Sequence, residues 1–228
     1  MIRHPVTLKS KNTFICLPQL KSYSTINLKF LFKTLESNGL MLFNSGKGQD
    51  FIAVELSNGQ IDYIFNLGDG PKRITSNSTK SLSNNKWHSV TIGRPAVYEH
   101  TLIVDDTQVT ISSKGFNIHL DLDGLLYLGG VKNDMYESLP KIIQSKHGFK
   151  GCLASLIFNG ENVNLFQTEV VVSSTLVSRG CYKPKIKCTH ACANHGICVR
   201  MWNSYVCDCD MTSFNGPTCS DGKYNVYY

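Results

Sequence analysis

The chain has 228 residues, of which 42% are hydrophobic and 18% are charged, and nine residues are cysteine. At about 150 residues per domain, this length accommodates one medium domain and one small one, and the composition excludes a collagen, a coiled coil and a disordered tail. The net charge of +6 is spread without a block of like charges, so it suits an acidic partner without requiring one. The longest apolar runs are far shorter than the roughly 18 residues of a membrane span. We therefore do not expect this chain to cross a bilayer.

The first 165 residues are dominated by the apolar–polar alternation that is typical of half-buried strands. The pattern is clearest in Ile26–Phe32, Phe51–Leu56 and Ile61–Phe65. Asn58-Gly59 lies between the second and third of these segments and predicts a hairpin turn, because both turn residues must accept positive φ. Asp105-Asp106 predicts another turn. Further strands are predicted at Trp87–Ile92, Leu102–Val104, Val109–Ser112, Leu125–Leu128 and Leu153–Phe158.

Many strands at short intervals, with no stretch of helical periodicity, predict an all-β sandwich or barrel. The longest irregular stretch, Val131–Lys150, is too long for a simple hairpin and is expected to lie across the surface. The strand pattern stops at Lys183–Lys187, where a cysteine-rich segment begins, and this change predicts a domain boundary. The segment from 188 to 219 is too short to bury much core, so we expect it to depend on covalent bridges.

Eight of the nine cysteines lie at or after Cys152, and six of them follow the spacing C-x3-C-x5-C-x8-C-x-C-x9-C over residues 188 to 219. A zinc site is the alternative, but six ligands on so short a segment exceed the four of a tetrahedral ion. Disulfides are favoured, and they imply an oxidising compartment. The remaining cysteine, Cys16, lies in an apolar strand, which favours a buried thiol over an intermolecular bridge.

The two chain ends and one sequon bear on secretion. Met1–Pro5 is not followed by the apolar core of a signal peptide, and Lys223–Tyr228 reads as the first strand of a further module. We therefore expect the chain to be part of a longer secreted protein. Asn77-Ser78-Thr79 is a potential N-glycosylation sequon in a Ser- and Asn-rich turn.

Enzyme motifs are absent from the sequence. It contains no G-x-S-x-G or H-E-x-x-H, and Gly46-Lys47-Gly48 lacks both the spacing and the Ser or Thr of a phosphate loop. None of the seven His residues pairs with Cys or Ser in a recognisable nucleophile motif. We predict a protein that is not an enzyme and that has no catalytic residues.

Five motifs in the first 160 residues resemble those of laminin G-like (LNS) domains and occur in the same order. They are Gly39–Phe43, Asp50–Leu56, Lys86–Val90, Leu126–Gly130 and Gly148–Leu153. The cysteine-rich segment, with Asn194–Cys198 and Tyr205–Cys209, resembles an EGF-like module. The run Trp202–Cys219 is similar to an EGF-like module of an α-neurexin, and the order of domains is most similar to a fifth LNS domain followed by a third EGF-like module. Contactin-associated proteins share this alternation, while agrin, perlecan and laminin α-chains are more distant alternatives.

The resemblance implies a jelly-roll β-sandwich of about a dozen strands and a small disulfide-rich module. The implied limits are an LNS domain at 1–181, a linker at 182–187, an EGF-like module at 188–219 and the truncated start of another domain at 220–228. It also implies four disulfides. They join Cys152 to Cys181, Cys188 to Cys198, Cys192 to Cys207 and Cys209 to Cys219.

LNS domains often hold a calcium ion at the rim of the sandwich, and matching motif by motif places its ligands in this chain. Asp50 and Asp121 match the two side-chain ligands, while Leu67 and His119 match the two carbonyl donors. Two carboxylates and two carbonyls leave coordination positions for water or for an acidic group of a partner. The other interpretation is that the paired Asp residues only form turns on a solvated surface. Asp69 and Asp123 lie nearby and are alternatives for the assignment.

Laminin G-like domains frequently bind heparan sulphate or acidic matriglycan through basic residues, so the resemblance also implies a possible glycan-binding role here. A solvated surface with Lys spread over several faces explains the same residues without a ligand. Nucleic acid is not expected as a partner, mainly because of the compartment. The basic residues in question cluster in the sequence around the long irregular stretch and the domain exit. They are Lys132, Lys141, Lys146, Lys150, Arg179, Lys183, Lys185 and Lys187.

Together these observations predict an extracellular recognition segment of a neurexin-like adhesion receptor. Its parent would cross the presynaptic membrane once, and the segment would bind adhesion proteins or acidic glycans with calcium at the LNS rim. The alternatives are a spacer between neighbouring LNS domains, or a heparan sulphate- or matrix-binding module of a contactin-associated, agrin- or laminin-like protein.

Overall fold

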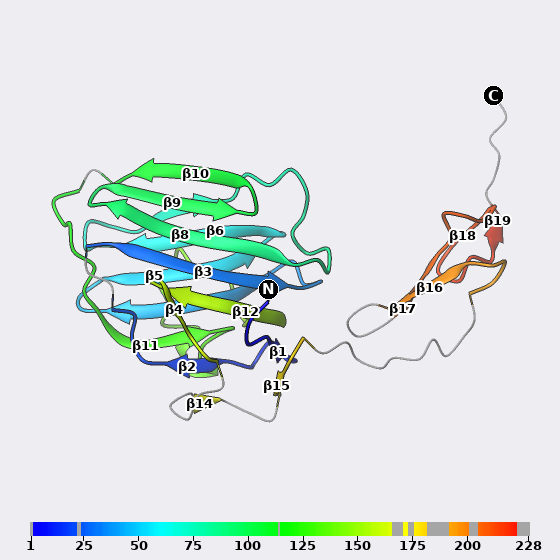
Figure 1. Ribbon diagram of the computed structural model, residues 1–228, viewed down its shortest axis with the longest axis horizontal. Coiled ribbons are helices and arrows are strands. Elements are labelled where there is room, and N and C mark those ends of the chain that lie inside the picture. The colour runs from blue at the N-terminus through cyan, green and yellow to red at the C-terminus, as the bar shows by residue number, and fades with distance from the viewer. Residues whose placement is uncertain are drawn as a thin grey trace. The chain divides into compact units, whose positions relative to one another are not determined.

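The computed structural model describes residues 2–21, 24–113, 115–165, 171–172, 176–181, 192–200 and 205–222. The chain divides into two compact units, Met1–Tyr182 and Lys183–Tyr228, and each is described by itself (Figure 1). The predicted linker at 182–187 and Cys188 lie outside the described residues.

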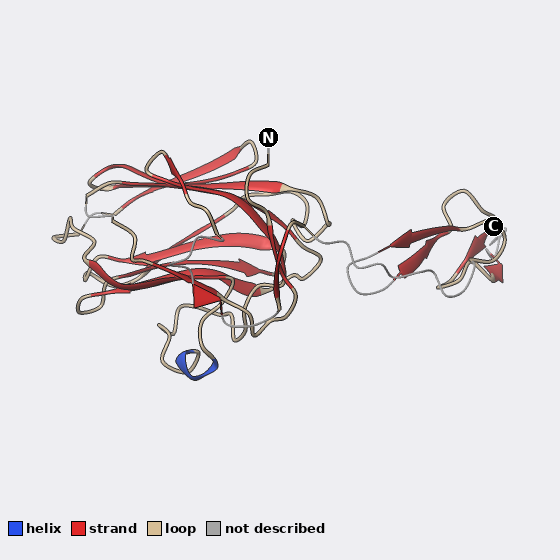
Figure 2. Cartoon of the chain, turned by 60° about the horizontal axis from the view of Figure 1, so that its bottom comes forward, coloured by secondary structure: helices blue, strands red, loops and turns tan. Residues whose placement is uncertain are grey.

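Unit 1 is a sandwich of two antiparallel sheets, which confirms the predicted all-β fold class. Figure 2 shows the sheets as two layers. The first has the order β10-β9-β8-β3-β12-β1-β15, with β13 paired to β12. Its strands are β1 (Val6–Leu8), β3 (Ile26–Lys33), β8 (His88–Ala96), β9 (Glu99–Val104), β10 (Thr107–Ser112), β12 (Gly151–Phe158), β13 (Glu161–Asn162) and β15 (Val177–Arg179).

The second sheet has seven strands in the order β14-β2-β11-β4-β5-β6-β7. They are β2 (Ile15–Leu17), β4 (Gly39–Gly46), β5 (Phe51–Ser57), β6 (Gln60–Asn66), β7 (Lys72–Thr75), β11 (Leu122–Leu128) and β14 (Val171–Val172).

Both predicted turns are present. Asn58 and Gly59 have φ values of 50° and 75° in the turn between β5 and β6, the conformation that the Asn-Gly pair favours in a tight hairpin. Asp105, with φ of 51°, begins the turn that joins β9 to β10. These turns set the register of two long antiparallel pairs, because a two-residue loop leaves one pairing in which the apolar residues stay on the core face.

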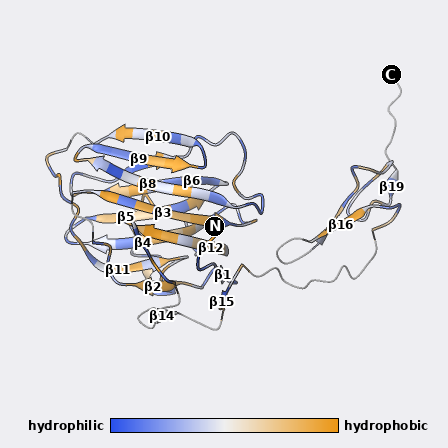
Figure 3. Ribbon diagram, in the orientation of Figure 1, coloured by the Kyte–Doolittle hydropathy of each residue, from blue (hydrophilic) through white to orange (hydrophobic). Residues whose placement is uncertain are grey.

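The main hydrophobic core lies between the two sheets. In β3, the buried residues Ile26, Leu28, Phe30 and Phe32 alternate with more exposed ones, so one face of this strand contacts the core and the other faces solvent. Figure 3 shows hydrophobic residues concentrated along the strands of the sandwich. The period-2 prediction is confirmed for this strand.

The prediction of half-buried strands at Phe51–Leu56 and Ile61–Phe65 is wrong. Residues 51–56 and 61–66 are buried without alternation, because the outer face of the seven-stranded sheet carries a second apolar layer. The segment Val131–Lys150, with the 3-10 turn η1 (Asn133–Met135), packs there, and Tyr136 and Ile143 join Phe43 and Ile64 in one cluster. Figure 2 shows the short turn outside one layer. The segment therefore covers the sheet, as a long surface stretch can.

The strand registers define two ends of unit 1. Gly46 pairs with Leu122 and Phe51 pairs with Asn66, so the β4–β5 turn, the β6–β7 turn and the start of β11 share one end, here called the rim end. Leu40 bridges Gly148, immediately before β12, at the opposite end. Cys152 follows at the start of β12, so its disulfide with Cys181 lies at the end opposite the rim.

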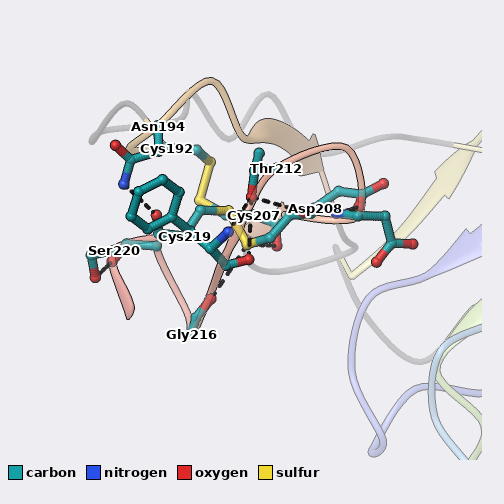
Figure 4. Close-up of a disulfide and its surroundings, with 12 residues drawn as sticks. Cys192, Asn194, Cys207, Asp208, Thr212, Gly216, Cys219 and Ser220 are labelled. Atoms are coloured by element: carbon teal, nitrogen blue, oxygen red, sulfur yellow. Dashed lines mark hydrogen bonds between the residues drawn. A yellow bond between two sulfur atoms is a disulfide. The ribbon is translucent and has the colours of Figure 1, made fainter. Parts of the chain in front are cut away.

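Unit 2 has two small sheets, formed by β16 (Ile197–Arg200) with β17 (Tyr205–Asp208) and by β18 (Phe214–Asn215) with β19 (Asp221–Gly222). Disulfides join Cys192 to Cys207 and Cys209 to Cys219. Figure 4 shows Cys192, Cys207 and Cys219 with the side chains around them. The Asn194 side chain donates to the Cys219 carbonyl, and Thr212 Oγ1 donates to the Cys209 carbonyl. Among the described residues of this unit, only Cys219 is a buried hydrophobic side chain.

Candidate metal site at the sandwich rim

Asp50 stands in the turn between β4 and β5, immediately before the buried strand. The Gly46 amide donates to the Asp50 carbonyl at 2.8 Å, and the Asp50 amide donates to the Lys47 carbonyl at 3.0 Å. A Cβ at Gly46 would collide with the Asp121 carbonyl oxygen, so glycine permits the close approach of the two loops. The turn thus presents the Asp50 carboxylate toward the loop that precedes β11.

Asp50 and Asp121 are brought together by a direct hydrogen bond. The Asp121 amide donates to Asp50 Oδ2 at 2.9 Å, and the Lys47 amide donates to the Asp121 carbonyl at 2.8 Å. The structure therefore places the two predicted carboxylate residues side by side, although 70 residues separate them in the chain.

Leu67 lies in the turn between β6 and β7. Asn66 Oδ1 accepts from the amides of Gly68 and Gly70 at 2.9 and 3.1 Å, an Asx-type arrangement that shapes the turn. A Cβ at Gly68 would lie 3.6 Å from Asp50 Oδ1, so the backbone that follows Leu67 adjoins this carboxylate oxygen. The third predicted residue is therefore also at the site.

The electrostatics of the rim are those of an acidic cluster. Burial raises the pKa of the Asp50 carboxyl; the hydrogen bond from the Asp121 amide lowers it, and the negative charges of Asp121 and Asp69 raise it further. Asp50 is half-buried, while Asp69 and Asp121 are exposed. A cation at this place would relieve the repulsion.

The other two candidate residues, His119 and Asp69, have different relations to the rim site. His119 is exposed in the loop that leads to Asp121, and the structure places it near the site only through this chain connection. Asp69 accepts from the Asn117 amide at 2.7 Å and from Asn117 Nδ2 at 3.2 Å, so it ties the β6–β7 turn to the β10–β11 loop. Sequence reasoning missed Asn117, because it stands in no motif. Within the described residues, no group of three or more His, Cys, Asp or Glu side chains is arranged for a metal.

Three of the four disulfides that the resemblance implied join described residues: Cys152–Cys181, Cys192–Cys207 and Cys209–Cys219. Cys198 is disulfide-bonded too, while its implied partner Cys188 lies outside the described residues. Cys16 is unpaired and 5% exposed, and burial raises the pKa of its thiol against the lowering effect of Lys132.

The predicted glycan-binding residues are divided. Lys141 and Lys146 are exposed on the segment that covers the outer sheet face, whereas Lys150 forms an ion pair with Glu36 at 3.3 Å. Lys185 and Lys187 lie outside the described residues. The structure therefore does not gather these residues into one described patch.

The sequon residue Asn77 is exposed just after β7. Lys72 begins this strand next to the rim turn, so Asn77 lies beyond the strand's other end. A glycan there would be attached away from the rim, and glycosylation stays a prediction.

Comparison with known proteins fits this architecture. Residues 32–161 match the family described as "Laminin G domain". The sandwich is similar to the LG1-3 region of the laminin α2 chain, with a TM-score of 0.68 at 22% identity over 78% of this chain and 35% of that one. It also resembles a heptameric SAP-like pentraxin from Limulus polyphemus, with a TM-score of 0.55 at 11% identity over 78% of this chain and 95% of that one. These two likenesses concern the fold.

Curated relatives are closer in sequence. Neurexin 1 of Drosophila melanogaster is 50% identical over 96% of this chain, and Neurexin-2 of Mus musculus is 43% identical over 97%. The chain spans 12% and 13% of the length of these two proteins. No helix among the residues that the structure describes is long and apolar enough to cross a membrane. The domain match, the fold and these identities together show that the chain belongs to the laminin G domain family and, within it, to the neurexin family.

Proposed function

We propose that this chain is an extracellular recognition segment of a neurexin-type receptor in synaptic adhesion, and that calcium bound at the rim end takes part in recognition. The disulfides support an oxidising, extracellular setting. The family supports a binding role without catalysis. The parent protein would be a single-pass protein of the presynaptic membrane, and the partners would be extracellular adhesion proteins or acidic glycans.

The rim residues fit a calcium ion by the chemistry of their donors. Calcium prefers carboxylate and carbonyl oxygens. Asp50 Oδ2 already accepts from the Asp121 amide, and the described residues supply no hydrogen bond to Asp50 Oδ1, which faces the backbone after Leu67. The charges that act on Asp50 are those of Asp121 and Asp69. The hydrogen-bonded approach of Asp121 to Asp50, with Asp69 near enough to repel the Asp50 carboxylate, is the observation that carries the proposal.

In this proposal Asp50 and Asp121 hold the ion with their carboxylates, and Leu67 and His119 offer backbone carbonyls. The bound ion would supply a positive charge with open coordination positions at an otherwise acidic surface. The hydrogen bonds among the three loops keep the donors in place before the ion arrives, which limits the ordering cost of binding. With two carboxylates, the Kd is expected on the order of 10⁻⁴ to 10⁻³ M, as in extracellular modules.

A calorimetric calcium titration of the full chain tests this site. We expect saturable binding that is lost in Asp50→Asn and in Asp121→Asn, because each change removes one of two anionic ligands. Asp123→Asn is the matched control, since this exposed residue follows Asp121 in the chain but lies outside the proposed ligand set. No binding up to several millimolar calcium, or equal loss in the control, would refute the assignment.

The same variants test the proposed role in recognition. Capture of neuronal surface proteins on the immobilised chain should require calcium and should fail with Asp50→Asn. Retention on heparin that decreases with salt but survives chelation would instead favour the glycan-binding alternative through basic residues. A chain that binds calcium but captures no protein in its presence would contradict the adhesion role while leaving the metal site intact.

A further inference from the structure

Unit 1 contains a groove that is separate from the acidic cluster at the rim end. It has a volume of about 470 Å³ and opens between the ends of the two sheets, beside β2 and the β12–β13 hairpin. Five leucines of the main core line it: Leu17, Leu20, Leu28, Leu126 and Leu156. The groove is therefore a place where the core reaches the surface.

Two β-bulges border this groove, one in each sheet. The five residues of β11 from Leu122 to Leu126 lie opposite only three residues of β4. The four residues of β12 from Ala154 to Ile157 lie opposite three residues of β3. Bulges redirect side chains and are frequent near binding sites. Here Leu126 ends the first bulge and Leu156 lies inside the second, so each irregularity supplies one leucine to the groove.

Ser155 carries the backbone strain of the second bulge. Its φ is 51°, a left-handed conformation that is unfavourable for a residue with a side chain in a strand. Such strain persists where surrounding contacts hold it, and it is concentrated at functional sites. The Ser155 amide donates to the Arg3 carbonyl, and Ser155 Oγ accepts from the Arg3 amide, so both groups hold the unusual backbone in place.

Two side-chain amides, one buried and one exposed, form hydrogen bonds in the walls of the groove. Asn44, which is fully buried, accepts from the Leu20 amide at 2.9 Å and donates to the Gly124 carbonyl at 2.7 Å. It thereby joins one wall to the bulge in β11. On the other wall, Asn159 accepts from the Asn27 amide at 3.0 Å and donates to the Lys21 carbonyl at 3.3 Å. Specific hydrogen bonds therefore position both walls of the groove.

The lining selects a class of ligand. The mouth carries uncharged amides, among them Gln19 and Asn162, and one residue of each charge, Lys21 and Glu161. The volume lies within the range of small-molecule sites, roughly 300 to 1,000 Å³, which are mostly apolar with a few polar groups that orient the ligand. An ion would find no excess of opposite charge, whereas an apolar body would cover the leucines.

We propose that this groove binds one uncharged amphipathic small molecule, with its apolar body against the five leucines and its hydrogen-bonding end at the amide mouth. The site involves none of the calcium ligands, so it does not depend on the proposed rim function.

Titration of the full chain with Nile red, an uncharged dye that fluoresces in apolar surroundings, tests the proposal. We expect saturable binding with a stoichiometry of one. Asn162→Trp places a large side chain at the mouth and should weaken binding at least about tenfold, whereas Asn162→Ala should stay within about threefold. Thr110→Trp, on the exposed side of β10, controls for dye binding to a new surface indole. Amide NMR spectra verify that each variant is folded.

Different outcomes of these titrations would overturn either the site itself or the class of its ligand. Non-saturable binding to the folded chain, or equal affinity of Asn162→Trp and Asn162→Ala, would overturn the site. Equal or tighter binding of the anionic dye 8-anilinonaphthalene-1-sulfonate would overturn the assigned ligand class, because the proposal expects it to bind at least about tenfold more weakly than Nile red.

Discussion

The two units of this chain contain the same kind of secondary structure but are stabilised in different ways. The sandwich buries dozens of apolar side chains between and outside its sheets, whereas the described part of unit 2 buries Cys219 alone among its hydrophobic side chains. Ile197, Val199 and Val206 of unit 2 are 40–60% exposed. Below a certain size, strands cannot bury enough surface to offset their conformational entropy. Covalent bridges then replace the core.

Removal of one disulfide from each unit tests this difference and should give the largest effect. We expect Cys192→Ser with Cys207→Ser to unfold unit 2, because losing a bridge costs a small domain about 2–5 kcal/mol. Cys152→Ser with Cys181→Ser is the matched pair in unit 1, where a similar loss should leave the sandwich folded. Amide NMR dispersion of each unit is the measurement. Persistence of native signals from residues 205–222 in the first variant would contradict this account.

Buried ion pairs provide a second test of what stabilises the sandwich. Arg73 Nη1 contacts Asp62 Oδ2 at 2.6 Å, Nη2 contacts Glu55 Oε1 at 3.4 Å, and the guanidinium also donates to the Ile142 carbonyl. Glu55 and Asp62 are almost completely buried. Arg73→Met leaves two buried carboxylates without their cation, and we expect it to destabilise the sandwich by about 3–5 kcal/mol.

Urea unfolding measures this loss, and Lys86→Met, which removes an exposed cation, should change stability by less than about 0.5 kcal/mol. Hydrogen exchange at residues 142–145 should also accelerate in Arg73→Met, since the Gln144 and Ser145 amides donate to Glu55. Equal stability of the two variants would show that the outer layer depends on apolar contacts alone.

The smallest expected effect is on the pH dependence of folding stability. It distinguishes a buried histidine from an exposed one. His100 is stacked on Phe65 with ring centroids 3.7 Å apart, and burial, followed by the charges of Arg94 and Lys72, lowers its pKa to about 3. Between pH 3 and about 6.5 the unfolded chain binds a proton at this residue that the folded chain does not. His100 therefore makes stability decrease as pH falls through this range, by at most about 1.4 kcal/mol per pH unit.

We expect His100→Phe to flatten the decrease in urea-unfolding stability between pH 6.5 and 4. His195→Asn, at an exposed position in unit 2, should leave the pH dependence of the sandwich unchanged. Parallel stability curves for the native chain and His100→Phe would show that His100 does not remain neutral in the folded sandwich.

Much of the strand pattern could be predicted from the sequence, because it depends on local chemistry. Ile26–Phe32 alternates along one strand, and Asn58-Gly59 accepts the positive φ of a hairpin by itself. The motif order around Gly39–Phe43 and Gly148–Leu153 identified the domain family, and cysteine spacing indicated a bridged second unit. Within the candidate site, Asp50 and Asp121 were found by motif rather than by any local signal of contact.

The tertiary structure decided what depends on residues far apart in the chain. Burial of Phe51–Leu56 on both faces requires the covering segment Val131–Lys150, which no period within the strand can report. The role of Asn117 arises only when its loop meets Asp69. The groove likewise brings together Leu126 and Leu156, which come from bulged strands of different sheets. Alternation and turn chemistry act over a few residues and specify strands, whereas the packing of distant segments determines which faces are covered and which groups meet.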